Sequence, residues 1–413
     1  MKKDLIIVLY GSTGDLTFRK LLPALNDLSK KNIINDKTLI IAVGRRNFNT
    51  SQYIDFVHQQ NKNLNITNIE KNITYYKMQI TEEEQYQNFK IYLDQYINEQ
   101  TQIIHYLAVA PELMLDIATN LSKDIISKNN LNHKLIFEKP FGKNYITARK
   151  ANEHLYQNYS EKQIYRIDHY LGKVINKNIL NLRFNNSLFS QLFNPKQISS
   201  FEIIAKEEDG ILERGSFYDN VGATKDMFQS HMLQMVALLT MNKPKKMTSD
   251  YIIKAKIKVL KSLKFKNCVF GQYNGYIHEK NVDINSLTDT LIQVDLYTNN
   301  KYKKIPIKVL TGKALDKKET YIKINYLDNS YVKINLFPII SLEIKTNLLN
   351  EEVKLLKQFS LQEFEYSYLL EAAINSNKEL FVSGEEIEAK WQLVDQILKS
   401  KKELIIYNKD YTL

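Results

Sequence analysis

With 413 residues, 44% of them hydrophobic, the chain is long enough for two or three globular domains. A single cysteine, Cys268, excludes an internal disulfide and fits a reducing, cytoplasmic compartment. No apolar run approaches the roughly 18 residues of a membrane-spanning helix. The formal net charge of +11 arises from basic residues dispersed among acidic ones, which indicates solvated faces rather than a nucleic-acid-binding surface.

Strand and helix patterns alternate through the first part of the chain. Leu5–Tyr10 is an apolar run too short for a signal peptide, and a glycine turn follows it at once. Helical periodicity then covers Leu16–Lys31. Further buried strands are predicted at Thr38–Val43, Ile103–Ala110 and Lys134–Phe137. Short apolar runs between helices are typical of a parallel sheet covered on both faces, so we expect a Rossmann-like α/β domain over residues 1–165.

The later part of the chain carries strand patterns set close together, with turn residues between them. Strands are predicted at Phe201–Ala205, Ile252–Leu260, Thr288–Tyr297, Lys304–Leu310, Glu319–Tyr326 and Tyr331–Leu336. Helical stretches interleave at Asp226–Met241 and Leu361–Ile374. We therefore expect an α+β C-terminal domain over residues 166–413, built on a large, mainly antiparallel sheet.

The glycine turn Gly11–Gly14 lies between a buried strand and a helix. Glycine lets the backbone approach a pyrophosphate closely, and the helix N-terminus presents free N–H groups to it. Only GxxG remains of the fuller GxGxxG pattern, so an ordinary turn is the alternative. The position of the turn favours a dinucleotide site.

Two arginines, Arg45 and Arg46, follow the second predicted strand, where an NAD enzyme usually places an acid for the ribose 2′-hydroxyl. Guanidinium groups there suit a 2′-phosphate through charge-assisted contacts. The alternative is a solvated surface pair. The sequence favours NADP over NAD, with NAD as the weaker cofactor.

Acid–base chemistry is concentrated in two segments. Residues 166–173 (RIDHYLGK) include Asp168, and residues 226–231 (DMFQSH) end in His231 on a predicted helix. Oxidation of an alcohol needs a base for the hydroxyl proton, and histidine is suited to that near neutral pH. A carboxylate at its other ring nitrogen would fix the tautomer. An isolated histidine is more often a packed or surface residue, and the sequence does not show that Asp168 and His231 meet. The histidines and the cysteine have no metal-ligand spacing, so no metal site is expected.

Several segments, in order along nearly the whole chain, resemble the glucose-6-phosphate dehydrogenase family. They are GSTGDLTFRKLLPAL (11–25), YLAVAP (106–111), FEKPFG (137–142), IYRIDHYLGK (164–173), DMFQSHMLQ (226–234), LTGKAL (310–315) and LFVSGEEIEAKW (380–391). RIDHYLGK is highly specific, whereas EKP also occurs in related sugar dehydrogenases. The resemblance implies oxidation of D-glucose 6-phosphate to 6-phospho-D-glucono-1,5-lactone with reduction of NADP.

The resemblance also assigns roles to matching residues. His231 would be the base, in a dyad with Asp168, and His169, Tyr170 and Lys173 would hold the 6-phosphate. Lys139 would lie between nicotinamide and sugar, with Pro140 after it open to a cis bond. Further sugar contacts would be Lys20, Glu207, Asp226, Lys313 and Lys318. The glycine turn and the resemblance together predict cofactor contacts at Gly11, Ser12, Thr13, Gly14, Asp15, Leu16, Arg45, Arg46, Tyr106 and Lys139.

Some positions depart from the family pattern. Val174 stands where glutamate is usual, Ser230 where asparagine is usual, and Ser216 where the family has glycine or an aromatic residue. The region after Tyr331 is compressed, so a second, structural NADP site is not expected. A homodimer or homotetramer is expected from the resemblance. Two alternatives stay open: another NAD(P)-dependent sugar dehydrogenase, and a non-catalytic regulator that binds NADP or a sugar phosphate.

Overall fold

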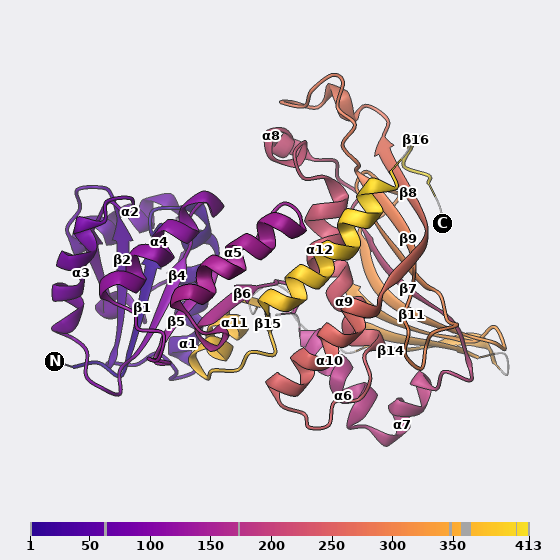
Figure 1. The fold of residues 1–413 in the computed structure, drawn as a ribbon, viewed down its shortest axis with the longest axis horizontal. Helices are drawn as coiled ribbons and strands as arrows, with labels where there is room; N and C mark the ends of the chain where they lie inside the picture. The colour runs from indigo at the N-terminus through magenta and orange to yellow at the C-terminus, as the bar shows by residue number, and fades with distance from the viewer. Residues whose placement is uncertain are drawn as a thin grey trace. The chain divides into compact units, whose positions relative to one another are not determined.

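Two units make up the chain in a computed structural model, each built on one large sheet (Figure 1). The first unit comprises residues 1–172 and 362–384, and the second comprises 173–361 and 385–413. The structure describes residues 2–61, 64–171, 174–346, 349–356, 365–401 and 403–411. Among these residues, no helix has the length and hydropathy that a membrane span would need.

A seven-stranded sheet in the order β15-β6-β5-β4-β1-β2-β3 forms the centre of the first unit. Its strands are β1 (Leu5–Tyr10), β2 (Thr38–Gly44), β3 (Ile73–Lys77), β4 (Gln102–Leu107), β5 (His133–Phe137), β6 (Ile164–Ile167) and β15 (Phe381–Val382). Every neighbouring pair is parallel except β15 with β6. The order 3-2-1-4-5-6 is that of the dinucleotide-binding Rossmann fold. The predicted Rossmann-like sheet is therefore confirmed, while β3, β6 and β15 were not predicted.

Helices cover both faces of this sheet, and the alternation of side chains along β1 shows how. Leu5, Ile7 and Leu9 enter one core with residues of α1, α2 and α11, whereas Ile6 and Val8 enter a second core with residues of α3, α4 and α5. The helices of the unit are η1 (Thr17–Leu21), α1 (Leu22–Lys30), α2 (Thr50–Gln60), η2 (Glu70–Asn72), α3 (Glu84–Asp94), α4 (Pro111–Asp124), α5 (Tyr145–Asn158), η3 (Glu161–Gln163) and α11 (Glu365–Ile374).

The helix predicted over Leu16–Lys31 is present, but its first turn, η1, is π-helical. The helix predicted over Leu361–Ile374 corresponds to α11, and residues 361–364 lie outside the described part of the chain. Residues 362–384 therefore return to the first unit after the second has begun.

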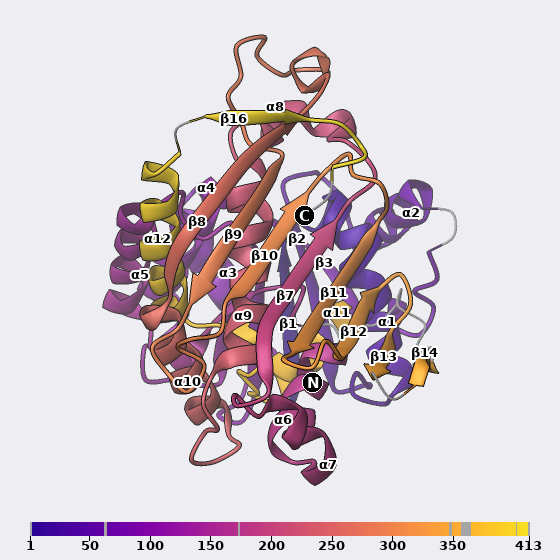
Figure 2. The same ribbon diagram turned by 90° about the vertical axis from the view of Figure 1, so that its right-hand side faces the viewer.

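The second unit is built on a nine-stranded sheet in the order β14-β13-β12-β11-β7-β10-β9-β8-β16, seen broadside in Figure 2. Its strands are β7 (Ile198–Lys206), β8 (Lys264–Tyr273), β9 (Leu291–Tyr297), β10 (Ile307–Gly312), β11 (Glu319–Tyr326), β12 (Tyr331–Phe337), β13 (Ser341–Thr346), β14 (Leu349–Leu356) and β16 (Leu404–Tyr407). Only the pairs β7–β10 and β8–β16 are parallel within these strands. The predicted large, mainly antiparallel sheet is confirmed.

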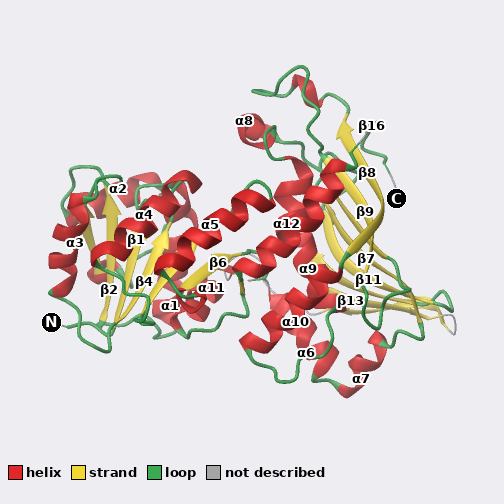
Figure 3. Ribbon diagram, viewed as in Figure 1, coloured by secondary structure: helices red, strands yellow, loops and turns green. Residues whose placement is uncertain are grey.

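Three helices of the second unit, α9, α10 and α12, lie on one face of this sheet (Figure 3). The full set of described helices in the second unit is α6 (Val174–Phe184), α7 (Ser187–Ser190), η4 (Gln191–Phe193), η5 (Leu212–Arg214), α8 (Gly215–Tyr218), η6 (Thr224–Met232), α9 (Leu233–Thr240), α10 (Ser249–Ser262), η7 (Tyr276–His278) and α12 (Gly384–Lys399). All eight residues of α9 are buried, which is the expected state of a helix that is apolar all round. The helix predicted over Asp226–Met241 is confirmed as η6 followed by α9.

The strand predicted at Ile252–Leu260 is wrong, because these residues lie in α10. The segment alternates apolar and polar residues, as a strand would, but its buried residues are Ile252, Lys256, Val259 and Leu260. These residues are separated by four, three and one positions, which places them on one face of a helix. The sequence contains both a strand-like and a helical pattern, and packing of that helical face selects the helix. The strands β8, β13, β14 and β16 were not predicted.

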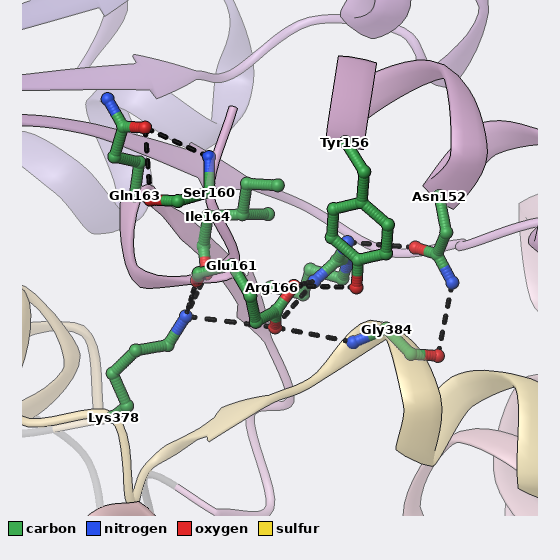
Figure 4. A network of polar contacts seen from close by, with 9 residues as sticks. All are labelled: Asn152, Tyr156, Ser160, Glu161, Gln163, Ile164, Arg166, Lys378 and Gly384. Atoms are coloured by element: carbon green, nitrogen blue, oxygen red, sulfur yellow. Dashed lines mark hydrogen bonds and ion pairs between the residues drawn. The ribbon is translucent and has the colours of Figure 1, made fainter. Parts of the chain in front are cut away.

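A polar network closes the first unit around Arg166, which is buried in β6 (Figure 4). Its guanidinium donates to both oxygens of Glu161, at 3.0 and 2.9 Å, and to Asn152 Oδ1 at 2.8 Å. Asn152 Nδ2 donates to the carbonyl of Gly384 at 3.1 Å, and the Gly384 N–H donates to Glu161 at 3.3 Å. The Lys378 Nζ atom lies 3.7 Å from Glu161 Oε1. Burial raises the pKa of the Glu161 carboxyl, but Arg166 and Lys378 outweigh it and hold that pKa below its ordinary value.

Two stacked histidines are buried in the same sheet. His105 Nδ1 lies 3.2 Å from the Tyr10 hydroxyl, and His105 Nε2 lies 3.2 Å from His133 Nδ1. Burial lowers the pKa of His133 to about 4, and burial together with His133 lowers the pKa of His105 well below its ordinary value. Both rings are therefore neutral in the folded chain at pH 7.

Acidification is expected to destabilise the first unit through these histidines. Below about pH 6.5, each histidine takes up a proton when the chain unfolds. The free energy of unfolding therefore does not vary with the charge of these histidines above that pH, and it decreases as the pH falls towards 4. The expected loss is at most about 1.4 kcal/mol per pH unit for each histidine. Urea unfolding at pH 7.5, 6.5 and 5.5 should show a smaller pH dependence in His133→Gln than in the unmodified chain. The matched control is His58→Gln, at a half-exposed histidine in α2, and an equal reduction there would contradict the assignment.

Candidate active site

The glycine turn of the first unit leaves no room for a side chain at its first position. Gly11 follows β1 with φ of +81°, and a Cβ there would lie 2.2 Å from the carbonyl oxygen of Ala108. The Gly14 N–H donates to the Gly11 carbonyl at 3.0 Å, which closes the turn before η1 begins. The backbone at the carboxyl end of β1 therefore stays bare, as close approach by a pyrophosphate requires.

The remaining residues predicted in this turn differ in exposure. Asp15 is exposed, and Thr13 and Leu16 are partly exposed. Ser12 is fully buried: its N–H donates to the Val43 carbonyl at 3.1 Å, so that group extends the pairing of β1 with β2. Ser12 thus contributes to the shape of the turn, and a direct cofactor contact by its side chain stays a prediction.

The two arginines after β2 are exposed at the carboxyl end of that strand. The Arg46 guanidinium lies over the Phe56 ring at 4.5 Å, and the Arg46 carbonyl accepts a hydrogen bond from Tyr75 at 2.9 Å. Stacking fixes the Arg46 side chain against α2, while Arg45 extends from the same edge of the sheet. Both therefore lie where the ribose of a dinucleotide lies in this fold.

The segment after β5 contains Lys139, which is partly exposed and precedes a cis bond to Pro140. The adjoining Glu138 is buried and accepts a hydrogen bond from the Tyr106 phenol in β4. Tyr106 has no exposed surface, so its predicted contact with a cofactor stays a prediction.

The segment after β6 holds the residues predicted to bind the 6-phosphate. Asp168 is buried, and its Oδ1 accepts from the Tyr170 N–H at 2.9 Å, which turns the chain away from the sheet. His169 and Tyr170 are partly exposed, and His169 Nε2 lies 3.5 Å from Glu138. Lys173 lies outside the described residues.

In the second unit, Glu207 and Lys313 lie side by side because they follow the parallel strands β7 and β10. The Lys313 ammonium is 2.6 Å from Glu207 Oε2, and Lys313 is 5% exposed. Lys313 Nζ also lies 5.4 Å from the centre of the buried Tyr218 ring. A buried ammonium paired with a carboxylate offers a donor and an acceptor at one place, which suits a polyhydroxylated ligand.

The helical turn η6 contains Asp226 and His231, which are 8% and 3% exposed, and it packs against β9 and β10. Because η6 is π-helical, with i→i+5 hydrogen bonds, Asp226 and His231 are separated by one widened helical turn. The widened turn is a common feature of functional sites.

Two further predicted sugar contacts are lysines at the surface. Lys20, in the π-helical turn η1, is exposed. Lys318 is exposed just before β11, and its ammonium lies 5.3 Å from the Phe337 ring. The first unit thus brings together the ends of β1, β2, β5 and β6, and the second brings together Glu207 and Lys313. The described residues contain no group of three or more His, Cys, Asp or Glu side chains arranged to hold a metal.

Sequence reasoning missed three residues of these sites. Glu138 contacts both Tyr106 and His169, although it adjoins Lys139 in the EKPFG segment and could have been noticed there. Tyr366 packs against His169 from a distant part of the chain, and no local signal indicates it. Tyr218 lies under Lys313, and burial, followed by the charges of neighbouring acids, raises the pKa of its phenol well above its ordinary value.

A dinucleotide-type sheet with a bare glycine turn, joined in one chain to a unit with a buried histidine on a π-helical turn, defines a nicotinamide-dependent oxidoreductase. Family models agree: "Glucose-6-phosphate dehydrogenase, NAD binding domain" matches residues 8–178, and "Glucose-6-phosphate dehydrogenase, C-terminal domain" matches residues 180–361. The chain belongs to the glucose-6-phosphate dehydrogenase family.

Individual relatives are similar over nearly their whole length. The chain is 31% identical to glucose-6-phosphate 1-dehydrogenase of Borreliella burgdorferi, covering 98% of this chain and 94% of that protein. It is 33% identical to the enzyme of Buchnera aphidicola subsp. Schizaphis graminum, covering 96% and 91%. Among solved structures, a glucose-6-phosphate dehydrogenase in complex with its substrate glucose-6-phosphate matches with a TM-score of 0.90 at 25% identity, covering 99% and 95%. The enzyme of Mycobacterium avium matches with a TM-score of 0.87 at 26% identity, covering 99% and 94%.

Proposed function

We propose that the chain oxidises D-glucose 6-phosphate at C1 to 6-phospho-D-glucono-1,5-lactone with reduction of NADP, the first step of the oxidative pentose phosphate pathway. The observation that carries this proposal is His231, a buried imidazole in the π-helical segment η6 that also contains Asp226. A binding protein has no need of a general base, so this residue favours catalysis over regulation.

His231 removes the proton of the C1 hydroxyl, and its dyad with Asp168, which the family resemblance implies, stays a prediction. A bound nicotinamide would supply the acceptor for the hydride that leaves C1. Glu207 and Asp226 accept hydrogen bonds from sugar hydroxyls, while Lys313 donates one. The protein contributes placement and electrostatics rather than covalent chemistry.

His169, Tyr170 and Lys173 hold the 6-phosphate. An imidazole and an ammonium complement the charge of a dianion, and the phenol adds a further donor. Two observations support the first two of these roles: His169 and Tyr170 are partly exposed, and both follow β6 at the carboxyl edge of the first sheet. Ligands bind at that edge in open α/β sheets. Lys139 follows β5 at the same edge, and its proposed place is between the sugar and the nicotinamide.

The assay that tests the proposal follows NADPH at 340 nm with glucose 6-phosphate or glucose, and with NADP or NAD. Rapid reduction of NADP with glucose 6-phosphate and weak activity on glucose is the expected result. Equal activity on the two sugars would favour another sugar dehydrogenase. Detectable ligand binding without turnover would favour a regulator.

NADP rather than NAD is the proposed cofactor, because Arg45 and Arg46 lie after β2 where an NAD enzyme uses an acid. Arg45→Ala is expected to raise KM for NADP roughly tenfold or more, since a charge-assisted contact to the 2′-phosphate is lost, and to change KM for NAD little. Steady-state kinetics with both cofactors measures the ratio. Lys77→Ala, at an exposed lysine in the next strand, is the matched control. Equal effects on the two cofactors would contradict the role of Arg45.

We propose a homodimer or homotetramer in solution. The helices α9, α10 and α12 lie on one face of the second sheet (Figures 1 and 2). Alternate residues of β11 and β12 are only partly buried, among them Tyr321, Tyr331 and Phe337. Light scattering on the purified chain measures the mass, and a monomeric mass would exclude this assembly.

A further inference from the structure

The buried carboxylate of Glu138, which accepts a hydrogen bond from the Tyr106 phenol, lies beside His169 in the first unit. We call Tyr106, Glu138, His169 and Tyr366 the Glu138 cluster. Tyr106 is in β4, Glu138 follows β5, and His169 follows β6. These neighbouring strands are parallel, so the three residues meet at one edge of the sheet, and α11 brings Tyr366 to them from the distant part of the chain.

The contacts within the Glu138 cluster lead from the phenols to the imidazole. The Tyr106 hydroxyl donates to Glu138 Oε1. The Tyr366 phenol, whose pKa is raised most by burial, lies near enough for the charge of Glu138 to raise that pKa further. The second carboxylate oxygen, Oε2, lies 3.5 Å from His169 Nε2. The rings of His169 and Tyr366 pack with their centres 5.2 Å apart and 38° between their planes.

The phenols can act here only as donors. Burial, reinforced by the charge of Glu138, raises the pKa of Tyr106 and of Tyr366 far above neutrality, so both stay protonated. The hydrogen bond from Tyr106 engages Oε1, and Oε2 faces the imidazole of His169. Glu138 itself is 8% exposed, so solvent screens the contact with His169 only weakly.

We propose that Glu138 is a positioning residue of the sugar-phosphate site, acting through His169. Its carboxylate attracts the Nε2–H of His169 and holds the ring, while Tyr366 supports the ring from one side. The imidazole is thereby oriented before the 6-phosphate arrives, so the substrate does not have to order it. Tyr106 serves this site by orienting Glu138, and Tyr366 serves it by packing against the His169 ring. The inference rests on the proposed function, because it assumes that His169 binds the phosphate.

Glu138→Gln tests this role, because it keeps the size of the side chain and removes its charge. The expected result is a KM for glucose 6-phosphate raised roughly tenfold, with kcat and KM for NADP within about twofold of the unmodified enzyme. Tyr366→Phe should change KM in the same direction by a smaller factor. The matched control is Glu153→Gln, at an exposed glutamate in α5, where KM should not change. Thermal unfolding of each variant verifies that it is folded.

A double-mutant cycle separates action through His169 from an independent effect. If Glu138 acts through His169, the double variant Glu138→Gln with His169→Gln should have the same KM for glucose 6-phosphate as His169→Gln alone. Additive effects, an unchanged or lowered KM for glucose 6-phosphate, or an equal rise in KM for NADP would overturn the inference. Failure of the unmodified enzyme to oxidise glucose 6-phosphate would overturn the proposed function instead, so the two failures are distinguishable.

Discussion

Replacement of His231 by asparagine is expected to lower kcat for glucose 6-phosphate oxidation by roughly 10²–10⁴-fold, the usual contribution of general base catalysis. Asparagine keeps a polar group of similar size but cannot accept the C1 hydroxyl proton. His231 is 3% exposed and lies on a buried π-helical turn, so the substitution changes little surface. Stopped-flow or steady-state measurement of NADPH formation gives kcat, and calorimetric titration with glucose 6-phosphate gives the binding constant.

Binding of the sugar should largely survive that substitution. Glu207 and Lys313 are held by their own ion pair of 2.6 Å and do not depend on the imidazole. His278→Asn is the matched control, since His278 is an exposed histidine of the same unit on η7. Loss of sugar binding in proportion to the loss of rate would contradict the assignment of His231 as the base.

Removal of one partner from the buried ion pair Lys256–Glu386 is expected to destabilise the second unit by about 3–5 kcal/mol. Lys256 in α10 and Glu386 in α12 are both 0% exposed, with their charged atoms 2.9 Å apart. Gln234 in α9 donates to the same carboxylate at 3.3 Å. Glu386→Gln leaves the Lys256 ammonium buried without a compensating charge, and the free energy of unfolding in urea measures the effect.

Simultaneous replacement of both partners by apolar residues is expected to lower the free energy of unfolding far less. Lys256→Met with Glu386→Leu removes the need to bury two charges and should leave stability within about 1–2 kcal/mol of the original value. The same two helices supply a matched control, because Lys261 and Glu385 form an ion pair that is half exposed. Glu385→Gln should change stability by less than about 1 kcal/mol. Equal destabilisation by Glu385→Gln and Glu386→Gln would show that burial does not decide the effect.

The parts of the fold that the sequence predicts correctly are those that depend on patterns among neighbouring residues. The apolar run of β1 and the turn at Gly11 are adjacent in sequence, so they predicted the first strand and the start of the Rossmann-like sheet. The alternation of β11 predicted its bounds for the same reason. In α10 the sequence holds both a two-residue and a helical period, and only packing against neighbouring elements selects the helix.

Contacts between distant segments could not be predicted in the same way. The approach of Tyr366 to Glu138 and His169 depends on the return of α11 to the first unit, long after the strands that carry the other two residues. Likewise, Glu207 and Lys313 are neighbours only because β7 and β10 pair in parallel. Motif resemblance proposed roles for some of these residues, but it assigned none to Glu138, although FEKPFG contains that residue, and it gave no indication of Tyr366.

The return of residues 362–384 to the first unit bears on the biosynthesis of the chain. Lys134 in β5 donates to the carbonyls of Ala373 and Ile374, the latter at 3.1 Å, and β6 pairs with β15. During translation neither partner exists until the ribosome has also made 173–361. A nascent chain ending near residue 172 therefore presents β6 as an open edge and Lys134 without its acceptors, both of which favour aggregation and chaperone binding. The first unit therefore matures only after residues 173–361, which belong to the second unit, have been synthesised.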